Sequence, residues 1–270
     1  CAHMIPAHVP EIYDSLKKFC KKNELYIDHS DFKLVFDYKD EEHKFVNLDS
    51  NIRGGDIFAF ISYNRNIVDE AKEEKIEFEN KAEYYLGFPK CCVKFFYALE
   101  KDQNNRFIIP IDRAKNFSYL LNNFLHWEGP YYFISHFPCS YDCKNSIRYA
   151  QKVSDAVERE DKKLFGEINY YLKLPVLYLG FKSHLSFDGI FKKNNIFKYD
   201  LVLGETYKDL ENSIFTDQKT FDIHHKTIEY VKLGNTLKIF EKEIKIYKDD
   251  KLIASLNKRN NTNIRFVKWD

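Results

Sequence analysis

Two short cysteine-bearing segments constrain this chain more than any other feature. The first reads Gly-Phe-Pro-Lys-Cys-Cys at 87–92, and the second reads His-Phe-Pro-Cys-Ser-Tyr-Asp-Cys at 136–143. In each segment a proline comes just ahead of the cysteines, and proline is favoured at the first position of a helix. The free N–H groups and the dipole of a helix N-terminus stabilise thiolates. We therefore expect each pair to open a helix, and the fold to bring both segments to one point.

The four cysteines are predicted to form a single site. Cys139 and Cys143 stand at i and i+4, so they share one face of the expected helix. Cys91 and Cys92 are adjacent, so both can ligate only if the backbone turns beside them. Thiolates are soft ligands that suit zinc and iron–sulfur clusters. All four are therefore predicted as cofactor and metal ligands, with sulfurs roughly 4–7 Å apart.

The sequence leaves the identity of the metal open. Structural zinc sites usually use Cys-x2–4-Cys turns, a spacing that 139–143 fits and 91–92 does not. Adjacent cysteine ligands favour an iron–sulfur cluster, with 4Fe-4S as the expected form, because a cluster presents its irons at several angles. Zinc is the alternative, and cysteines that merely pack in a core are a third interpretation. No Cys-x3-Cys-x2-Cys triplet is present, which disfavours radical-SAM chemistry.

The same segments carry a resemblance to a known family. Together with Val-Lys-Phe-Phe-Tyr at 93–97, they resemble an uncharacterised prokaryotic domain-of-unknown-function family with Gly-Phe-Pro-x-Cys-Cys and His-x-Pro-Cys-x3-Cys motifs. The resemblance covers about residues 80–200. It implies a cytoplasmic bacterial or archaeal protein whose cysteines are its signature, and it implies no particular reaction.

Composition excludes several classes of protein. The 42 basic and 41 acidic side chains leave a net charge of +1, which excludes polyanion binding driven by bulk charge. The 24 Phe and 19 Tyr residues exclude a disordered chain. No run approaches the ~20 apolar residues of a membrane span, so we expect a cytoplasmic protein with no membrane partner. Residues 1–3 are interpreted as a cloning remnant ahead of Met4, and the remaining five cysteines do not suggest a disulfide framework in a reducing compartment.

Hydrophobic periodicity predicts an α+β fold with a mixed helical N-terminal half that carries the cysteine site and a β-rich C-terminal part. The expected domains are 4–173 and 174–270. Helices are predicted over 10–25 and 65–86, after Pro89, and from Pro138 to about 170. Strands are predicted over 32–38, 46–52, 57–62, 176–179, 185–187, 190–191, 196–199, 236–240, 243–247 and 252–255. Tight turns are expected at 188–189, 194–195 and 248–251.

His136 is the one catalytic candidate, because it lies three residues before Cys139 and an imidazole titrates near neutral pH. A histidine that caps a turn is the alternative. The predicted function is an iron–sulfur enzyme that performs sulfur transfer or Lewis-acid chemistry on a small molecule or a tRNA base. The alternative is a non-catalytic binding module stabilised by zinc or a cluster. An open metal position beside a polar pocket favours the enzyme, and a closed four-sulfur site favours the module.

Overall fold

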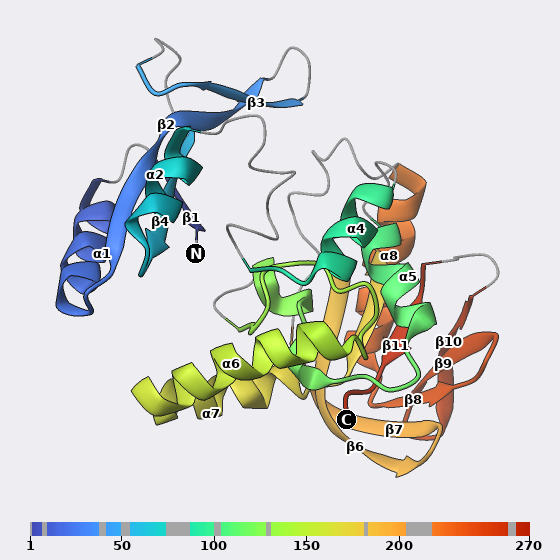
Figure 1. Cartoon of the computed structure of the whole chain (residues 1–270). Coiled ribbons are helices and arrows are strands. Elements are labelled where there is room, and N and C mark those ends of the chain that lie inside the picture. Colours follow the sequence, from blue (N-terminus) through green and yellow to red (C-terminus); the bar gives the residue numbers. More distant parts are fainter. Residues whose placement is uncertain are drawn as a thin grey trace. The chain divides into compact units, whose positions relative to one another are not determined.

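The chain divides into two compact units, Cys1–Val93 and Lys94–Asp270. The division falls inside helix α4 (Lys90–Ala98), which continues into the second unit and is described with it (Figure 1). The computed structural model describes residues 2–6, 10–37, 42–49, 55–73, 87–99, 104–127, 131–180, 183–203, 218–258 and 263–270.

The first unit is a four-stranded antiparallel sheet, in the order β1-β4-β2-β3, with two helices. Side chains alternate along β4: Phe58 and Phe60 pack against α2, whereas Ala59 packs against Tyr13 of α1. Because successive side chains of a strand point to opposite faces, α1 and α2 cover opposite faces of the sheet. The elements are β1 (Ala2–Pro6), α1 (Pro10–Lys22), β2 (Tyr26–Asp37), β3 (Glu42–Asn47), β4 (Asp56–Ser62) and α2 (Arg65–Glu73).

The structure bears on three expectations for this unit. Ala2 and His3, interpreted as part of a cloning remnant, belong to β1 and pair with β4. The strand expected at 46–52 is β3, which ends at Asn47 and is followed by a turn. The helix expected over 65–86 is α2 as far as Glu73, and residues 74–86 lie outside the described part of the chain.

The second unit is built around a seven-stranded antiparallel sheet in the order β10-β9-β8-β7-β6-β5-β11. Its strands are β5 (Val176–Gly180), β6 (Ser183–Lys193), β7 (Ile196–Leu203), β8 (Thr236–Ile239), β9 (Glu243–Lys248), β10 (Lys251–Asn257) and β11 (Arg265–Val267). Its helices are α4, α5 (Asn105–Arg113), the 3-10 turns η1 (Tyr119–Leu121) and η2 (Phe124–Trp127), α6 (Lys144–Glu160), α7 (Lys162–Leu172) and α8 (Gln218–Leu233).

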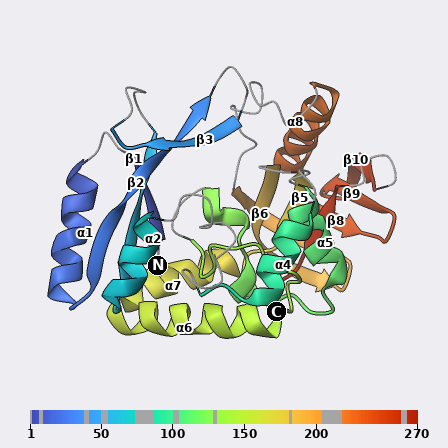
Figure 2. The ribbon, with the colours of Figure 1, turned by 45° about the horizontal axis from the view of Figure 1, so that its top comes forward.

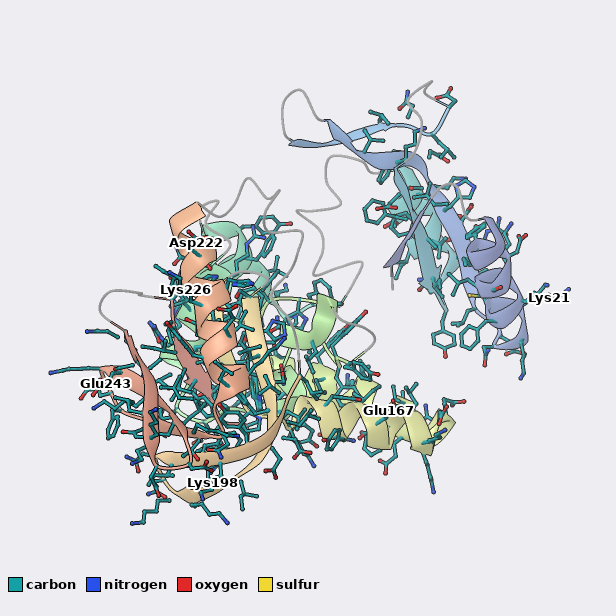
Figure 3. All side chains as sticks on the ribbon, turned by 180° about the vertical axis from the view of Figure 1, so that it is seen from behind. Lys21, Glu167, Lys198, Asp222, Lys226 and Glu243 are labelled. Atoms are coloured by element: carbon teal, nitrogen blue, oxygen red, sulfur yellow. The ribbon has the colours of Figure 1, made fainter. Side chains whose placement is uncertain are left out.

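Two cores lie on the two faces of this sheet. Val176 and Tyr178 of β5 join a core formed with α5, α6 and α7, whereas Leu177 and Leu179 join a second core beneath α8. Helix α8 is amphipathic, since Ile228 is buried while charged side chains point outward. Figure 3 labels two of these outward side chains, Asp222 and Lys226. It also labels Lys198 of β7 and Glu243 of β9.

The expected fold class is confirmed, because helices and the cysteine group precede a seven-stranded antiparallel sheet. The observed division inside α4 differs from the domain boundary expected between residues 173 and 174. A single core contains Phe107 and Leu172 from one side of that position and Tyr178 and Trp269 from the other. The first strands of the sheet therefore complete the core of the preceding helices.

The single helix expected from Pro138 to about 170 is wrong. The structure has two helices, α6 and α7, and α6 begins only at Lys144. They separate at Asp161, whose φ of −148° leaves the helical region. Its carboxylate accepts hydrogen bonds from the backbone N–H groups of Lys163 and Leu164 at 3.0 and 2.9 Å, which caps α7.

Among the described residues, no helix combines the length and the apolar character that crossing a bilayer requires.

Candidate metal centre

The structure brings the four predicted cysteines together. The sulfurs of Cys91, Cys92, Cys139 and Cys143 all lie within 4.8 Å of one another. The Cys91 and Cys92 sulfurs are 3.9 Å apart. Cys91 and Cys92 belong to the first turn of α4, whereas Cys139 and Cys143 come just before α6; both helices are labelled in Figures 1 and 2. The prediction of one four-cysteine group is therefore confirmed.

Cys91 and Cys92 occupy the first turn of α4, as the preceding proline predicts. The carbonyl of Pro89 accepts hydrogen bonds from the N–H groups of Cys92 and Val93 at 2.8 and 3.1 Å. Gly87, with φ of +66°, turns the chain into this helix in a conformation that favours glycine. Because the helix begins between the proline and the cysteines, both thiols lie at its positive end.

Cys139 and Cys143 converge for a different reason from the one expected. They do not share a helix face, because Cys139 lies before α6 in a turn and Cys143 is the N-cap residue of α6. The N–H of Cys143 donates to the carbonyl of Ser140 at 3.0 Å, which closes the turn. The Cys143 side chain makes no capping hydrogen bond to the first turn of α6.

Contacts with the rest of the second unit fix this cysteine turn. Tyr141 is fully buried and its hydroxyl donates to Asn123 Oδ1 at 2.9 Å, while its carbonyl accepts from Ser118 N at 3.1 Å. Burial raises the pKa of Tyr141 well above its usual value, so the hydroxyl keeps its proton. Asp142 accepts from Lys115 N at 2.9 Å and from the Ser140 hydroxyl, and these bonds lower its pKa.

His136 lies beside this turn and is buried. Its Nε2 shares a hydrogen bond of 2.9 Å with the hydroxyl of Ser146, in the first turn of α6. Burial lowers the pKa of His136 to about 4, although the nearby Cys143 acts in the opposite direction. The imidazole is therefore neutral at pH 7. Its position near the cysteines agrees with the sequence, whereas a catalytic role stays a prediction.

Two aromatic residues that are close to the cysteines in the sequence stack on each other. Phe96, on α4, stacks on Phe137, which lies two residues before Cys139, with ring centroids 5.9 Å apart. The guanidinium of Arg106 lies 4.0 Å from the Phe96 centroid, and burial lowers its pKa. The sequence does not predict a buried Arg106, because nothing in its local pattern sets it apart from a surface arginine.

The four cysteines differ in their burial. Cys92 is buried, whereas Cys91, Cys139 and Cys143 are partly exposed. Four sulfur donors this close together provide a complete tetrahedral ligand set for a soft metal ion. The residues present therefore fit a metal or a small cluster without any ligand from outside the chain.

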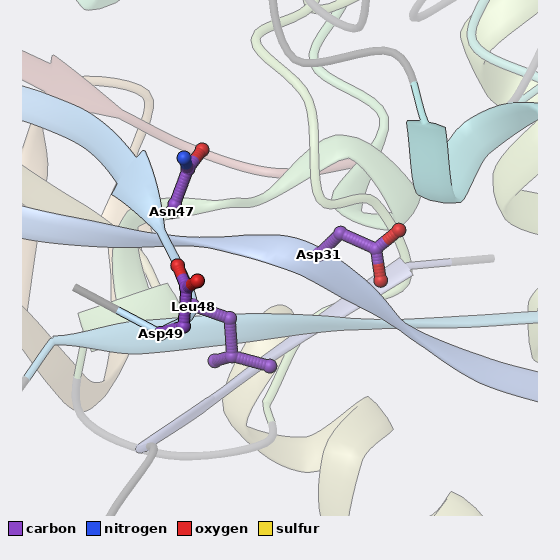
Figure 4. Close-up of a pocket in the computed structure, with 4 residues that line it drawn as sticks. All are labelled: Asp31, Asn47, Leu48 and Asp49. Atoms are coloured by element: carbon purple, nitrogen blue, oxygen red, sulfur yellow. The ribbon is translucent and has the colours of Figure 1, made fainter.

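The first unit also has a shallow hollow, and no cysteine lines it (Figure 4). It is lined by Asp31 of β2 and by Asn47, Leu48 and Asp49 at the end of β3. The carboxylate of Asp31 also pairs with Lys72 Nζ at 3.7 Å. Exposed carboxylates in such a position are ordinary surface features, so this hollow adds no candidate chemistry.

Comparison with known proteins gives no match to a family model, a curated protein or a solved structure. The resemblance to the uncharacterised prokaryotic family stays a prediction.

Proposed function

We propose that this chain is a metalloprotein in which Cys91, Cys92, Cys139 and Cys143 bind a single ion as four thiolates, with zinc as the resident metal. The observation that carries this proposal is that all four sulfurs lie within 4.8 Å of one another. Bonds of about 2.3 Å to one tetrahedral ion put thiolate sulfurs roughly 3.8 Å apart. The 3.9 Å separation of the Cys91 and Cys92 sulfurs agrees with this value.

The same distances disfavour a 4Fe-4S cluster. Each of its cysteines binds a different corner iron, which spreads the four sulfurs to roughly 6–7 Å from one another. Cys91 and Cys92, on adjacent residues of one helix turn, would have to move apart to reach two irons. A single ion needs no such movement, so the alternative expectation of a zinc-stabilised module now has the better support.

In this proposal the metal has a structural role. It ties the first turn of α4 to the turn that precedes α6, so two segments far apart in the sequence share one ligand set. Four protein ligands leave no open position for a substrate, as in closed structural zinc sites. A reducing cytoplasmic location suits the site, because thiolates remain unoxidised there.

Elemental analysis tests the proposal directly. Protein purified without oxygen, from cells supplied with both iron and zinc, is expected to be colourless and to hold one zinc per chain. Replacement of zinc by cobalt is expected to give the visible bands of a tetrahedral cobalt–thiolate centre, and Cys92→Ser is expected to weaken them. A brown protein with several irons and acid-labile sulfide would overturn the single-ion proposal.

The second candidate is the iron–sulfur enzyme expected from the sequence, acting on a small molecule or a tRNA base. The partial exposure of Cys91, Cys139 and Cys143 favours it, because a substrate can reach a cluster only where its ligands are not fully buried. A bound cluster with an incompletely ligated iron would supply Lewis-acid or sulfur-transfer chemistry. His136 would then hold or move a proton beside Cys143. Its burial and low pKa fit a neutral base better than an acid.

A further inference from the structure

We infer that His136 and Ser146 are positioning residues that hold the cysteine turn in its metal-binding conformation. The inference rests on the proposed function, because it assumes that Cys139 and Cys143 bind a metal. It assigns a role to two residues that are not themselves ligands. The hydrogen bond between His136 and Ser146 closes the base of the segment that contains both cysteines.

The first observation is the place of this hydrogen bond in the chain. His136 Nε2 and Ser146 Oγ are 2.9 Å apart and their residues are ten apart in sequence. Cys139 and Cys143 lie between them, so the bond fixes the two ends of the segment relative to each other. Ser146 belongs to the first turn of α6, and Cys143 is the N-cap residue of that helix. A shift of Ser146 would therefore shift the Cys143 sulfur with it.

The second observation is burial. Ser146 is fully buried and His136 is only 7 % exposed, so water does not readily replace either partner. A buried hydrogen bond is costly to break, because the remaining partner loses a bond without regaining one to solvent. Tyr149, one turn further along α6, packs edge-on against His136 with centroids 5.4 Å apart. The imidazole is thus held from two positions on the same helix.

Residues outside the ligand set commonly fix the orientation of metal ligands. Hydrogen-bonded groups behind the ligands set their orientation, and losing one typically lowers metal affinity 10- to 100-fold. His136 acts on Cys143 through the backbone of α6, so it is a positioning residue here and not a catalytic one. The effect should be specific to metal binding and separable from a general loss of stability.

Cobalt titration of the full chain provides the test, with three variants and a matched control. Ser146→Ala removes the hydroxyl. His136→Gln keeps a polar nitrogen at a similar reach, and His136→Leu removes it. Ser154→Ala is the control, because Ser154 is also buried on α6, about two turns further along. Affinity and the thiolate-to-cobalt band are measured for each variant, together with the melting temperature of the metal-free protein.

We expect Ser146→Ala and His136→Leu to bind cobalt at least about tenfold more weakly than the wild type, with an altered thiolate-to-cobalt band. His136→Gln should recover most of the affinity, and Ser154→Ala should match the wild type in both readouts. Wild-type affinity in Ser146→Ala overturns the inference and leaves the proposed function intact. If Ser146→Ala does not fold, equal affinities of His136→Gln and His136→Leu overturn it instead. A wild type with no thiolate-to-cobalt band overturns the proposed function and this inference with it.

Discussion

The hydroxyl of Tyr141 donates a 2.9 Å hydrogen bond to Asn123 Oδ1, which anchors the middle of the cysteine turn in the core of the second unit. Tyr141 lies between Cys139 and Cys143, and its ring stacks on Phe124 with centroids 5.7 Å apart. The turn is therefore anchored by a side chain that is not one of the four candidate ligands. Small zinc domains lack such an anchor in a core, and their folding depends on the metal itself.

The first prediction concerns this anchor. Tyr141→Phe keeps the buried ring but removes the donor to Asn123 Oδ1, and an unsatisfied buried acceptor costs about 1–3 kcal/mol. Chemical denaturation should show this loss in the free energy of unfolding. Tyr230→Phe on α8 is the control, because Tyr230 is 37 % exposed and should lose almost nothing. Equal stability of the two variants would show that the Tyr141 hydrogen bond adds nothing net.

Metal removal should leave the fold in place. The cysteine turn has its own anchors in Tyr141, Asp142 and His136, so a chelator is expected to leave the circular dichroism spectrum unchanged. Loss of an ion bound at about a hundred times its dissociation constant removes roughly 3 kcal/mol of stability. For a unit of this size, the melting temperature should fall by about 5–10 °C. Complete unfolding on chelation would contradict this prediction.

Thiol reactivity should report the burial pattern residue by residue. With metal bound, the four ligands are expected to resist alkylation. After chelation Cys91, Cys139 and Cys143 should react quickly, whereas Cys92 and Cys20 should react slowly because they are buried. Mass spectrometry of peptides from timed alkylation measures each rate. Rapid alkylation of Cys91 in the metal-loaded protein would argue against its role as a ligand.

The buried histidine His184 should make the stability of the protein depend on pH. Burial lowers the pKa of His184 from the usual value near 6.5 to about 4. Below about pH 6.5, His184 binds a proton in the unfolded chain but stays neutral in the folded protein. The stability that the neutral imidazole contributes to folding is therefore present above about pH 6.5 and is lost as the pH falls toward 4. The loss approaches roughly 3 kcal/mol from this group alone.

Unfolding free energies measured between pH 7 and 4 test this dependence. His184→Gln removes the titrating group from a fully buried position, so its pH profile should be flatter than that of the wild type. His225→Gln is a control, because His225 lies exposed on α8. A wild-type stability that stays constant across this range would contradict the lowered pKa of His184.

The cysteine group could be predicted from the sequence because thiols are few and their chemistry is specific. Cys91 and Cys92 also lie at a helix start, as Pro89 indicates. The route by which Cys139 and Cys143 meet could not be predicted. It depends on Tyr141 reaching Asn123 and on Asp142 reaching Lys115, and such long-range contacts leave no periodic signal. The i, i+4 spacing correctly predicted that the sulfurs of Cys139 and Cys143 lie close together, but it wrongly placed both residues on one helix.

The same limit explains the errors in the fold. Helix α8 was missed because its sequence mixes β-branched and aromatic residues with histidines, which have modest helix propensity, and its helical conformation depends on packing against the sheet. The alternation of β8, β9 and β10 was clear enough to place those strands within a few residues. Local sequence patterns thus predicted the elements that have one exposed face. The conformation of the other elements depends on tertiary packing, which local patterns do not show.

Gly189 provides the last prediction, because the sequence suggested a tight turn there and the structure has a continuous strand. The pairing of β6 with β7 shifts register between Asp188 and Gly189, so the strand contains a bulge where a hairpin was expected. A Cβ at Gly189 would lie 2.2 Å from the carbonyl oxygen of Lys198 and 2.7 Å from Tyr199 Cα. Both are backbone atoms of the paired strand, which cannot retreat without breaking the ladder.

Gly189→Ala should therefore destabilise the protein by about 2–3 kcal/mol, as overpacking in a rigid site does. Gly166→Ala is the matched control, since Gly166 lies in α7 with nothing within 4 Å of its would-be Cβ. Alanine is a better helix former than glycine, so that variant should gain about 0.5–1 kcal/mol. Denaturant titration of both variants compares the two effects. Opposite signs would support the bulge, and a neutral Gly189→Ala would mean that the chain makes a flexible turn there after all.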